Sequence, residues 1–239
     1  MRDAIPTRVH GELRSFGRRR GRALSPRQNA LITSLLPKVR LDLSHPAPSS
    51  LEKMFCKPVS KVWLEIGFGA AEHLIFQARG NRDVGIIGCE PYVDGVVKAL
   101  TAIDETKLEN VLLHDDDVRD VLRWLPERSL ERVFILFPDP WPKARQRKRR
   151  LINPGLFELL ARSMRDNGQL IISTDIEDYV RTILVAAQSA DVNFVWHAQN
   201  AASWRERPSY WPPTRYEQKA IREGRAPYFF VFERREHRP

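Results

Sequence analysis

The chain has 239 residues, a formal net charge of +9 and a pI of about 9.9. This length suits one α/β domain with an extension, and the positive charge favours an anionic partner, with nucleic acid as the leading candidate. No segment approaches the roughly 20 apolar residues of a membrane span, so no membrane segment is expected. The two cysteines, Cys56 and Cys89, lack CxxC spacing. They argue against a disulfide framework or a cysteine-ligated zinc site and fit a reducing cytoplasm, and no metal is expected.

Residues 1–30 are basic and interrupted by glycine and proline, which predicts an arm distinct from a domain over residues 31–239. Composition leaves two interpretations open, a mobile solvated tail or an arm that contacts phosphates. The arginines available for such contacts are Arg14, Arg18, Arg19, Arg20 and Arg22. Ser25 and Pro26 predict the start of a short helix that stops at Pro37. Residues 41–60 are expected to form a connecting loop.

From Lys61 onward, apolar runs alternate with helical patterns. Strands are expected at residues 61–66, 84–90, 111–114, 130–137, 168–173, 193–198 and 228–233, and helices at 71–79, 93–103, 118–124, 153–164 and 177–189. The last two strands flank a polar, irregular segment at 199–226. This order predicts an α/β fold with a doubly wound, mainly parallel, seven-stranded Rossmann-like sheet. Its edge is expected to carry an antiparallel hairpin.

The turn after the first strand is the expected cofactor site, because ligands bind beyond the carboxyl ends of parallel strands. Gly67 and Gly69 in this turn would let the backbone approach a ligand closely. Glu72 stands where a dinucleotide fingerprint has its third glycine, and its charge disfavours a pyrophosphate and hence NAD. Glu90 ends the second strand, where a carboxylate can accept hydrogen bonds from ribose hydroxyls. Glu65 either faces a cationic group or pairs with a neighbouring arginine.

Acidic residues follow four successive strands of the predicted sheet. Asp115, Asp116 and Asp117 come after the third strand, and one of them is expected to cap the next helix. The carboxylates at these strand ends suit a ligand that carries a nucleoside, an ammonium and a sulfonium, as S-adenosylmethionine does. A phosphate-bearing dinucleotide suits them poorly.

The stretch Val133–Arg150 places a strand, an acidic corner and a cationic run in immediate succession. The prolines on either side of Asp139 fix its backbone, which favours a positioned carboxylate over the alternative of a stiff turn with an exposed acid. Trp141 either stacks on a base or belongs to the core. The cations that follow either contact phosphates or form a solvated face. They are Lys143, Arg145, Arg147, Lys148, Arg149 and Arg150.

Several motifs in collinear order resemble one family, the bacterial tRNA (guanine-N7)-methyltransferases. They are LEIGFG (64–69), GCEPYVDGV (88–96), HDDDV (114–118), FPDPWPKARQRKRR (137–150), STDIEDY (173–179) and TRYE (214–217). The resemblance implies a class I enzyme that transfers a methyl group from S-adenosylmethionine to a variable-loop guanine of tRNA. It also implies a cytoplasmic protein that is a monomer or homodimer.

The resemblance implies a role for individual residues as well. Cofactor contacts would come from Glu65, Gly67, Gly69, Glu90, Asp117 and Asp139, substrate contacts from Lys143, Asp175, Thr214, Arg215, Tyr216 and Glu217, and RNA contacts from Arg145, Arg147, Lys148, Arg149 and Arg150. The carboxylate of Asp175 would orient the guanine, or alternatively cap the helix near Glu177. The chain departs from the family at Ala70 and Ala71, where glycine is common. These two methyl groups put the backbone approach to the cofactor in question.

Guanine N7 carries an in-plane lone pair and no proton, so methyl transfer to it needs alignment and desolvation but no general base. The product ring is cationic, and Asp139 is expected to stabilise the developing charge. Two other hypotheses compete. The first is a catalytically silent tRNA-binding protein on a methyltransferase scaffold, supported by the Ala70–Ala71 turn. The second is a nicotinamide oxidoreductase, which conflicts with Glu72.

Overall fold

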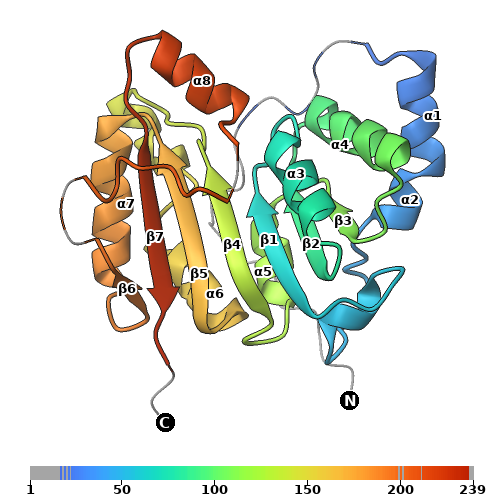
Figure 1. Ribbon diagram of the computed structural model, residues 1–239, viewed down its shortest axis with the longest axis horizontal. Helices are drawn as coiled ribbons and strands as arrows, with labels where there is room; N and C mark the ends of the chain where they lie inside the picture. The colour runs from blue at the N-terminus through green and yellow to red at the C-terminus, as the bar shows by residue number, and fades with distance from the viewer. Residues whose placement is uncertain are drawn as a thin grey trace.

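The computed structural model describes residues 17, 19, 21, 23–198, 200, 202–210 and 212–236. Four of the arm arginines, Arg14, Arg18, Arg20 and Arg22, lie outside these residues. The described strands form one sheet in the order β3-β2-β1-β4-β5-β7-β6 (Figure 1). Their bounds are β1 Lys61–Ile66, β2 Val84–Cys89, β3 Val111–His114, β4 Leu130–Leu136, β5 Met164–Thr174, β6 Phe194–Trp196 and β7 Tyr228–Arg234. The strands β3, β2, β1, β4 and β5 are parallel, so the predicted doubly wound fold is confirmed.

Both faces of the sheet are covered, because successive strand residues point to opposite sides. On β1, Val62 and Leu64 pack with α5 (Val118–Trp124), α6 (Pro154–Ser163) and α7 (Glu177–Ser189). Trp63 points to the other face and packs with α1 (Pro26–Ser34), α2 (Leu36–Val39), α3 (Glu72–Gly80) and α4 (Val93–Thr106). Apolar runs without alternation therefore mark strands that are buried on both sides. None of the described helices combines the length and apolarity needed to cross a membrane.

The first helix begins as predicted but does not end as predicted. Ser25 caps α1 in a reciprocal capping box with Gln28. The helix ends at Ser34, and Pro37 lies in the first turn of α2, where its missing N–H costs no helical hydrogen bond. Pro37 thus continues the helical segment in a new direction. Because α1 spans residue 30 and buries Leu31 in the core, the division of the chain at that residue stays a prediction.

The edge of the sheet is more elaborate than a hairpin. β7 pairs antiparallel with both β5 and β6, so the predicted antiparallel pair is present and its second strand lies inside the sheet. The segment expected to be irregular at 199–226 contains α8 (Arg215–Arg222). In Figure 1 the segment before α8 crosses the front of β7 and β5 and enters α8 at the end of the helix nearer α3. Two 3-10 helices complete the described elements, η1 (Leu51–Met54) and η2 (Ala144–Arg149).

Candidate active site

A cavity of about 310 Å³ lies at the carboxyl ends of β1, β2 and β4, the position expected for a ligand of a doubly wound sheet. Apolar side chains and three carboxylates share its wall. The residues that line it include Ile66, Gly67, Gly69, Glu90, Tyr92, Asp116, Val118, Arg119, Leu136, Asp139, Trp141 and Tyr216. The structure thus brings together the glycine turn, the end of β2, the start of α5 and the proline corner.

The carboxylate of Glu90 holds the glycine turn through a hydrogen bond from Gly69. Gly67 and Gly69 adopt left-handed conformations, with φ of 73° and 53°, which glycine accepts without a steric penalty. The buried carboxylate of Glu90 accepts hydrogen bonds from the N–H groups of Gly69 and Tyr92, both at 2.9 Å. Burial raises the pKa of Glu90 above its usual value, against the lowering effect of these two bonds. Glu90 therefore shapes the turn and also presents negative charge to the cavity.

One of the two alanines that depart from the family, Ala71, packs into the core. Ala71 adopts a left-handed conformation with φ of 63° and is almost fully buried, so its methyl group packs into the core. This conformation costs an alanine about 1 kcal/mol relative to a right-handed one. Across the turn, a Cβ on Gly95 would lie 2.4 Å from the carbonyl oxygen of Gly69. The approach of α4 to the turn therefore depends on glycine at position 95, and the turn forms with both alanines present.

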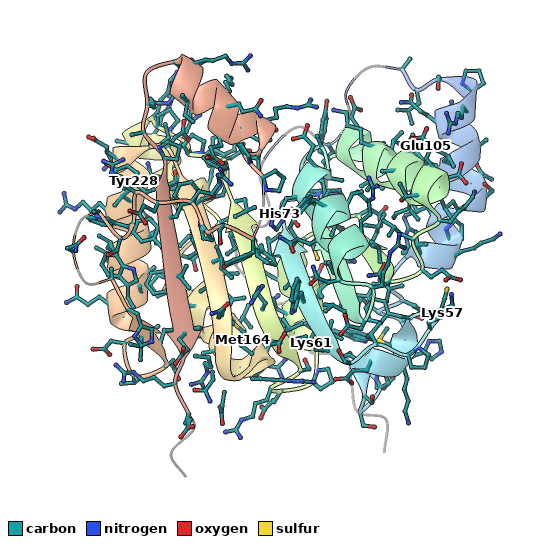
Figure 2. The ribbon with its side chains drawn as sticks, viewed as in Figure 1. Lys57, Lys61, His73, Glu105, Met164 and Tyr228 are labelled. Atoms are coloured by element: carbon teal, nitrogen blue, oxygen red, sulfur yellow. The ribbon has the colours of Figure 1, made fainter. Side chains whose placement is uncertain are left out.

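Glu65, one of the predicted cofactor residues, is not among the residues that line the cavity. It is buried, and its Oε2 lies 2.8 Å from Nδ1 of His73, so its observed partner is a histidine where an arginine was the expected alternative. His73, labelled in Figure 2, belongs to α3 and packs on the sheet, with its ring 4.6 Å from that of Phe134 on β4. The pair of Glu65 and His73 therefore joins β1 to α3.

After the third strand, Asp116 lines the cavity, whereas the predicted residue is Asp117. Asp117 is buried, caps α5 through the N–H of Arg119, and accepts two hydrogen bonds from the guanidinium of Arg119. Asp116 and Arg119 lie in the cavity wall. Three consecutive aspartates offer no sequence signal that separates these positions. The structure shows Asp116 in the cavity wall and Asp117 bonded to Arg119, and the predicted cofactor contact of Asp117 stays a prediction.

The proline corner holds Asp139 in the cavity wall. Phe137 and Trp141, on either side of the corner, have φ of 52° and 42°, a conformation that non-glycine residues adopt at a cost and that clusters at functional sites. Nε of Arg150 donates a hydrogen bond of 2.8 Å to the carbonyl oxygen of Pro140 and so fixes the corner from inside. Desolvation raises the pKa of Asp139 above the usual aspartate value. Asp139 is an exposed residue in the cavity wall, and its role in the reaction stays a prediction.

Arg150 differs from the predicted RNA contact. Its side chain is only 2% exposed, and its guanidinium bonds to Thr182 and to the carboxylate and carbonyl of Asp178 while lying over the ring of Tyr179. A buried arginine with all of these partners does not reach the surface where RNA would lie. The structure thus assigns Arg150 a positioning role for the corner that holds Asp139.

The other cations of the run remain at the surface around η2. Lys143, Arg145, Arg147 and Lys148 are exposed, and Arg147 pairs with Asp178 at 2.8 Å. Arg149 is half-buried and lies over the ring of Trp141, 5.0 Å from its centroid. Since both Trp141 and Arg149 line the cavity, the cationic surface begins at the cavity mouth.

The predicted substrate segment forms the start of α8. Thr214 caps the helix by accepting from the N–H of Glu217, and Tyr216 lines the cavity with its ring close to Gly69. Glu217 is buried, pairs with Arg207, and has a raised pKa that results from desolvation. Its Oε2 has no hydrogen-bond partner among the described residues. Glu217 is not among the residues that line the cavity, although Tyr216 beside it in the chain is.

Asp175 directly follows β5 and forms an ion pair with Arg225 instead of capping α7. Its Oδ2 accepts a hydrogen bond of 2.7 Å from Nε of Arg225, just beyond α8. The helix α7 has Ile176 at its N-cap and no side-chain cap, so the predicted capping role is wrong. Asp175 is not among the residues that line the cavity.

The described residues of the basic arm lie across the cavity mouth. Gly17 lines the cavity, and a Cβ on it would lie 3.7 Å from Asp139 Oδ2. Arg19 pairs with Asp116 at 2.7 Å, and its carbonyl accepts from the N–H of Val93. A Cβ on Gly21 would lie 2.1 Å from Asp94 Oδ2, so a side chain at position 21 would require Asp94 to shift. The composition of the arm did not predict that these residues lie at the cavity.

Comparison with known proteins agrees with this geometry. A family model described as "Putative methyltransferase" matches residues 59–230. The tRNA (guanine-N(7)-)-methyltransferase of Chelativorans sp. (strain BNC1) is 45% identical over 219 residues, which cover 92% of this chain and 94% of that protein. The chain belongs to the tRNA (guanine-N(7)-)-methyltransferase family. A second member, from Rhodospirillum rubrum, is 42% identical over 234 residues, covering 97% of this chain and 91% of its own length.

The family resemblance inferred from the motifs is thus confirmed. Among solved structures, a Streptococcus mutans protein described as a putative methyltransferase, in complex with SAH, aligns with a TM-score of 0.50. The alignment covers 74% of this chain and 89% of that one at 10% identity, so it supports the fold. Within the part of the chain that the structure describes, no three His, Cys, Asp or Glu side chains are grouped so as to hold a metal ion.

Proposed function

We propose that this member of the family transfers a methyl group from S-adenosylmethionine to N7 of a guanine in the variable loop of tRNA. The observation that carries the proposal is the placement of the Asp139 carboxylate in a cavity wall whose mouth opens beside an exposed cationic surface. The cavity suits a cationic sulfonium, and the surface suits a phosphate backbone. The family membership supplies the reaction.

The residues of the cavity fit S-adenosylmethionine by the chemistry of their side chains. Glu90, Asp116 and Asp139 supply negative charge for a ligand with an ammonium and a sulfonium, and Ile66, Val118 and Leu136 supply apolar contacts. The turn at Gly67 and Gly69 leaves backbone exposed to the ligand. When bound, S-adenosylmethionine supplies a methyl group on a sulfonium, which an in-plane lone pair attacks without help from a base.

The side chains of this protein position the guanine and stabilise the positive charge that develops on it. Asp139 stabilises the positive charge that develops on the guanine ring, and its corner, fixed by Arg150, needs no reorganisation to do so. The orphaned oxygen of Glu217 offers an acceptor for the N1 and N2 hydrogens of a guanine. Tyr216 and Trp141 exclude water from the cavity mouth. Lys143, Arg145 and Lys148 contact the tRNA backbone.

The test is to map the modified nucleotide in tRNA incubated with the protein and S-adenosylmethionine. The expected product is 7-methylguanosine in the variable loop, with the rate reduced by Asp139→Ala. Full activity of Asp139→Ala would remove the role assigned to that carboxylate. The alternative of a catalytically silent tRNA-binding protein predicts no heat on titration with S-adenosylhomocysteine. A cytoplasmic location and a monomeric or homodimeric state remain predictions.

A further inference from the structure

Glu72, the acid that argues against a dinucleotide, has partners of its own. It is the first residue of α3, directly after the glycine turn, and Arg215 is the first residue of α8. Its Oε1 accepts hydrogen bonds from Nε and Nη2 of Arg215, at 2.9 and 2.7 Å. Its Oε2 accepts from the backbone N–H of Arg215 at 3.2 Å. A single carboxylate therefore joins the beginnings of two helices that are 143 residues apart in the sequence.

Glu72 has positively charged surroundings. The N-terminus of each helix carries partial positive charge and unsatisfied N–H groups, and the guanidinium adds a full charge. The two side chains are 43% and 57% exposed, so the ion pair alone contributes little to stability. The ion pair matters because it fixes the beginning of α8 against the beginning of α3.

The residue that follows Arg215 completes the cavity. Tyr216 lines the cavity, and a Cβ on Gly69 would lie 3.3 Å from its Cε2. A second link ties the same segment to α3, because Nε2 of Gln77 donates to the carbonyl oxygen of Tyr210 and also contacts His73. His73 in turn holds Glu65 at the end of β1 (Figure 2). The segment that leads into α8 is thus fastened to α3 at both of these places.

We propose that Glu72 is a positioning residue that couples the cofactor turn to α8. A ligand that orders the turn also orders Glu72, which then holds α8 so that Tyr216 lines the cavity. By linkage, a docked α8 raises the affinity of the turn for the cofactor by the same factor. The proposal rests on the proposed function, since it takes S-adenosylmethionine as the ligand of the turn and α8 as the element that receives the guanine.

Amide hydrogen exchange tests the coupling directly. S-adenosylhomocysteine is expected to slow exchange in residues 212–222 of the unaltered protein, and Glu72→Ala is expected to abolish that slowing while the ligand still protects residues 84–90. Glu109→Gln, which alters an exposed acid paired with Lys57, is the matched control and should behave as the unaltered protein does. Equal ligand-induced protection of α8 in Glu72→Ala and in the control would overturn the proposal.

A double-mutant cycle gives the second readout. Glu72→Ala and Arg215→Met are each expected to weaken binding of S-adenosylhomocysteine about fivefold, and the double variant no further, because both changes remove the same ion pair between the two side chains. Glu72→Gln, which keeps the shape and one acceptor, should lose about twofold and remains informative if Glu72→Ala is poorly folded. Additive losses would refute the coupling. If the unaltered protein binds no S-adenosylhomocysteine at all, the proposed function fails instead, so the two failures are distinguishable.

Discussion

Replacing Arg150 by alanine separates a structural role from an RNA contact. The change removes hydrogen bonds to the carbonyl oxygens of Pro140 and Asp178, to the hydroxyl of Thr182 and to the carboxylate of Asp178. At about 1 kcal/mol for each of the four bonds, the free energy of unfolding falls by about 4 kcal/mol. Asp178 is 38% exposed and regains water, which keeps the loss at this level.

For a domain of this size, a loss of about 4 kcal/mol lowers Tm by roughly 8–16 °C. Because the Pro140 carbonyl loses its anchor, the Asp139 corner loosens and kcat falls as well. The salt dependence of tRNA binding should not change, since Arg150 does not reach the surface. Thermal unfolding, single-turnover methylation and filter binding over a range of salt concentrations measure these three quantities.

The exposed Lys148 provides the contrasting variant. Lys148→Ala is expected to leave Tm unchanged and to reduce the slope of log K against log salt by somewhat less than one, the effect of a single phosphate contact. The assignment of Arg150 to the interior is refuted if Arg150→Ala has the same Tm as the unaltered protein and reduces the slope of log K against log salt as much as Lys148→Ala does.

Three further outcomes are expected. Lys107 ends α4 in a left-handed conformation with φ of 50°, so Lys107→Gly should raise the free energy of unfolding by about 1 kcal/mol and Tm by roughly 2–4 °C; a lower Tm would contradict this. Because desolvation raises the pKa of Asp139, kcat should fall on acidification with a midpoint above the usual value of 3.8, and a midpoint at or below 3.8 would count against a charged Asp139 in the reaction. The native state does not lose stability from this group as the pH falls through its raised pKa, since the cost of burying the carboxylate disappears there. Glu90→Gln leaves one of two N–H donors without an acceptor and should weaken S-adenosylhomocysteine binding about tenfold by calorimetry; a Kd within twofold would argue that Glu90 does not shape the turn.

The strands and most helices could be predicted because their signals are local. The apolar runs at 61–66 and 84–89 are buried on both faces, and helix starts such as Ser25 carry caps. The helix α8 was missed because RYEQKAIR is polar, and only Glu217 and Ala220 are buried. The spacing of Thr214 and Glu217 is nevertheless that of a capping box, and it could have located the start of this helix.

The roles of single charged residues could not be predicted in the same way, because they depend on distant partners. Nothing within the run Lys143–Arg150 distinguishes the buried Arg150, whose partners Asp178 and Thr182 follow 28 and 32 residues later. Glu72 likewise acquires its role from Arg215, far along the chain. The sequence thus predicted the position of the cavity and two of the acids that line it, Glu90 and Asp139. The three-dimensional structure shows the partners of each charged side chain.

The place of β7 in the sheet has a consequence for biosynthesis. β7 is made after every other described strand, yet it lies between β5 and β6 and supplies all the strand pairing that β6 has. Until Tyr228–Arg234 has left the ribosome, β5 is an open edge that another chain can pair with. A nascent chain stalled before residue 228 would therefore display an aggregation-prone edge, and completion of the sheet would proceed only after translation has passed β7.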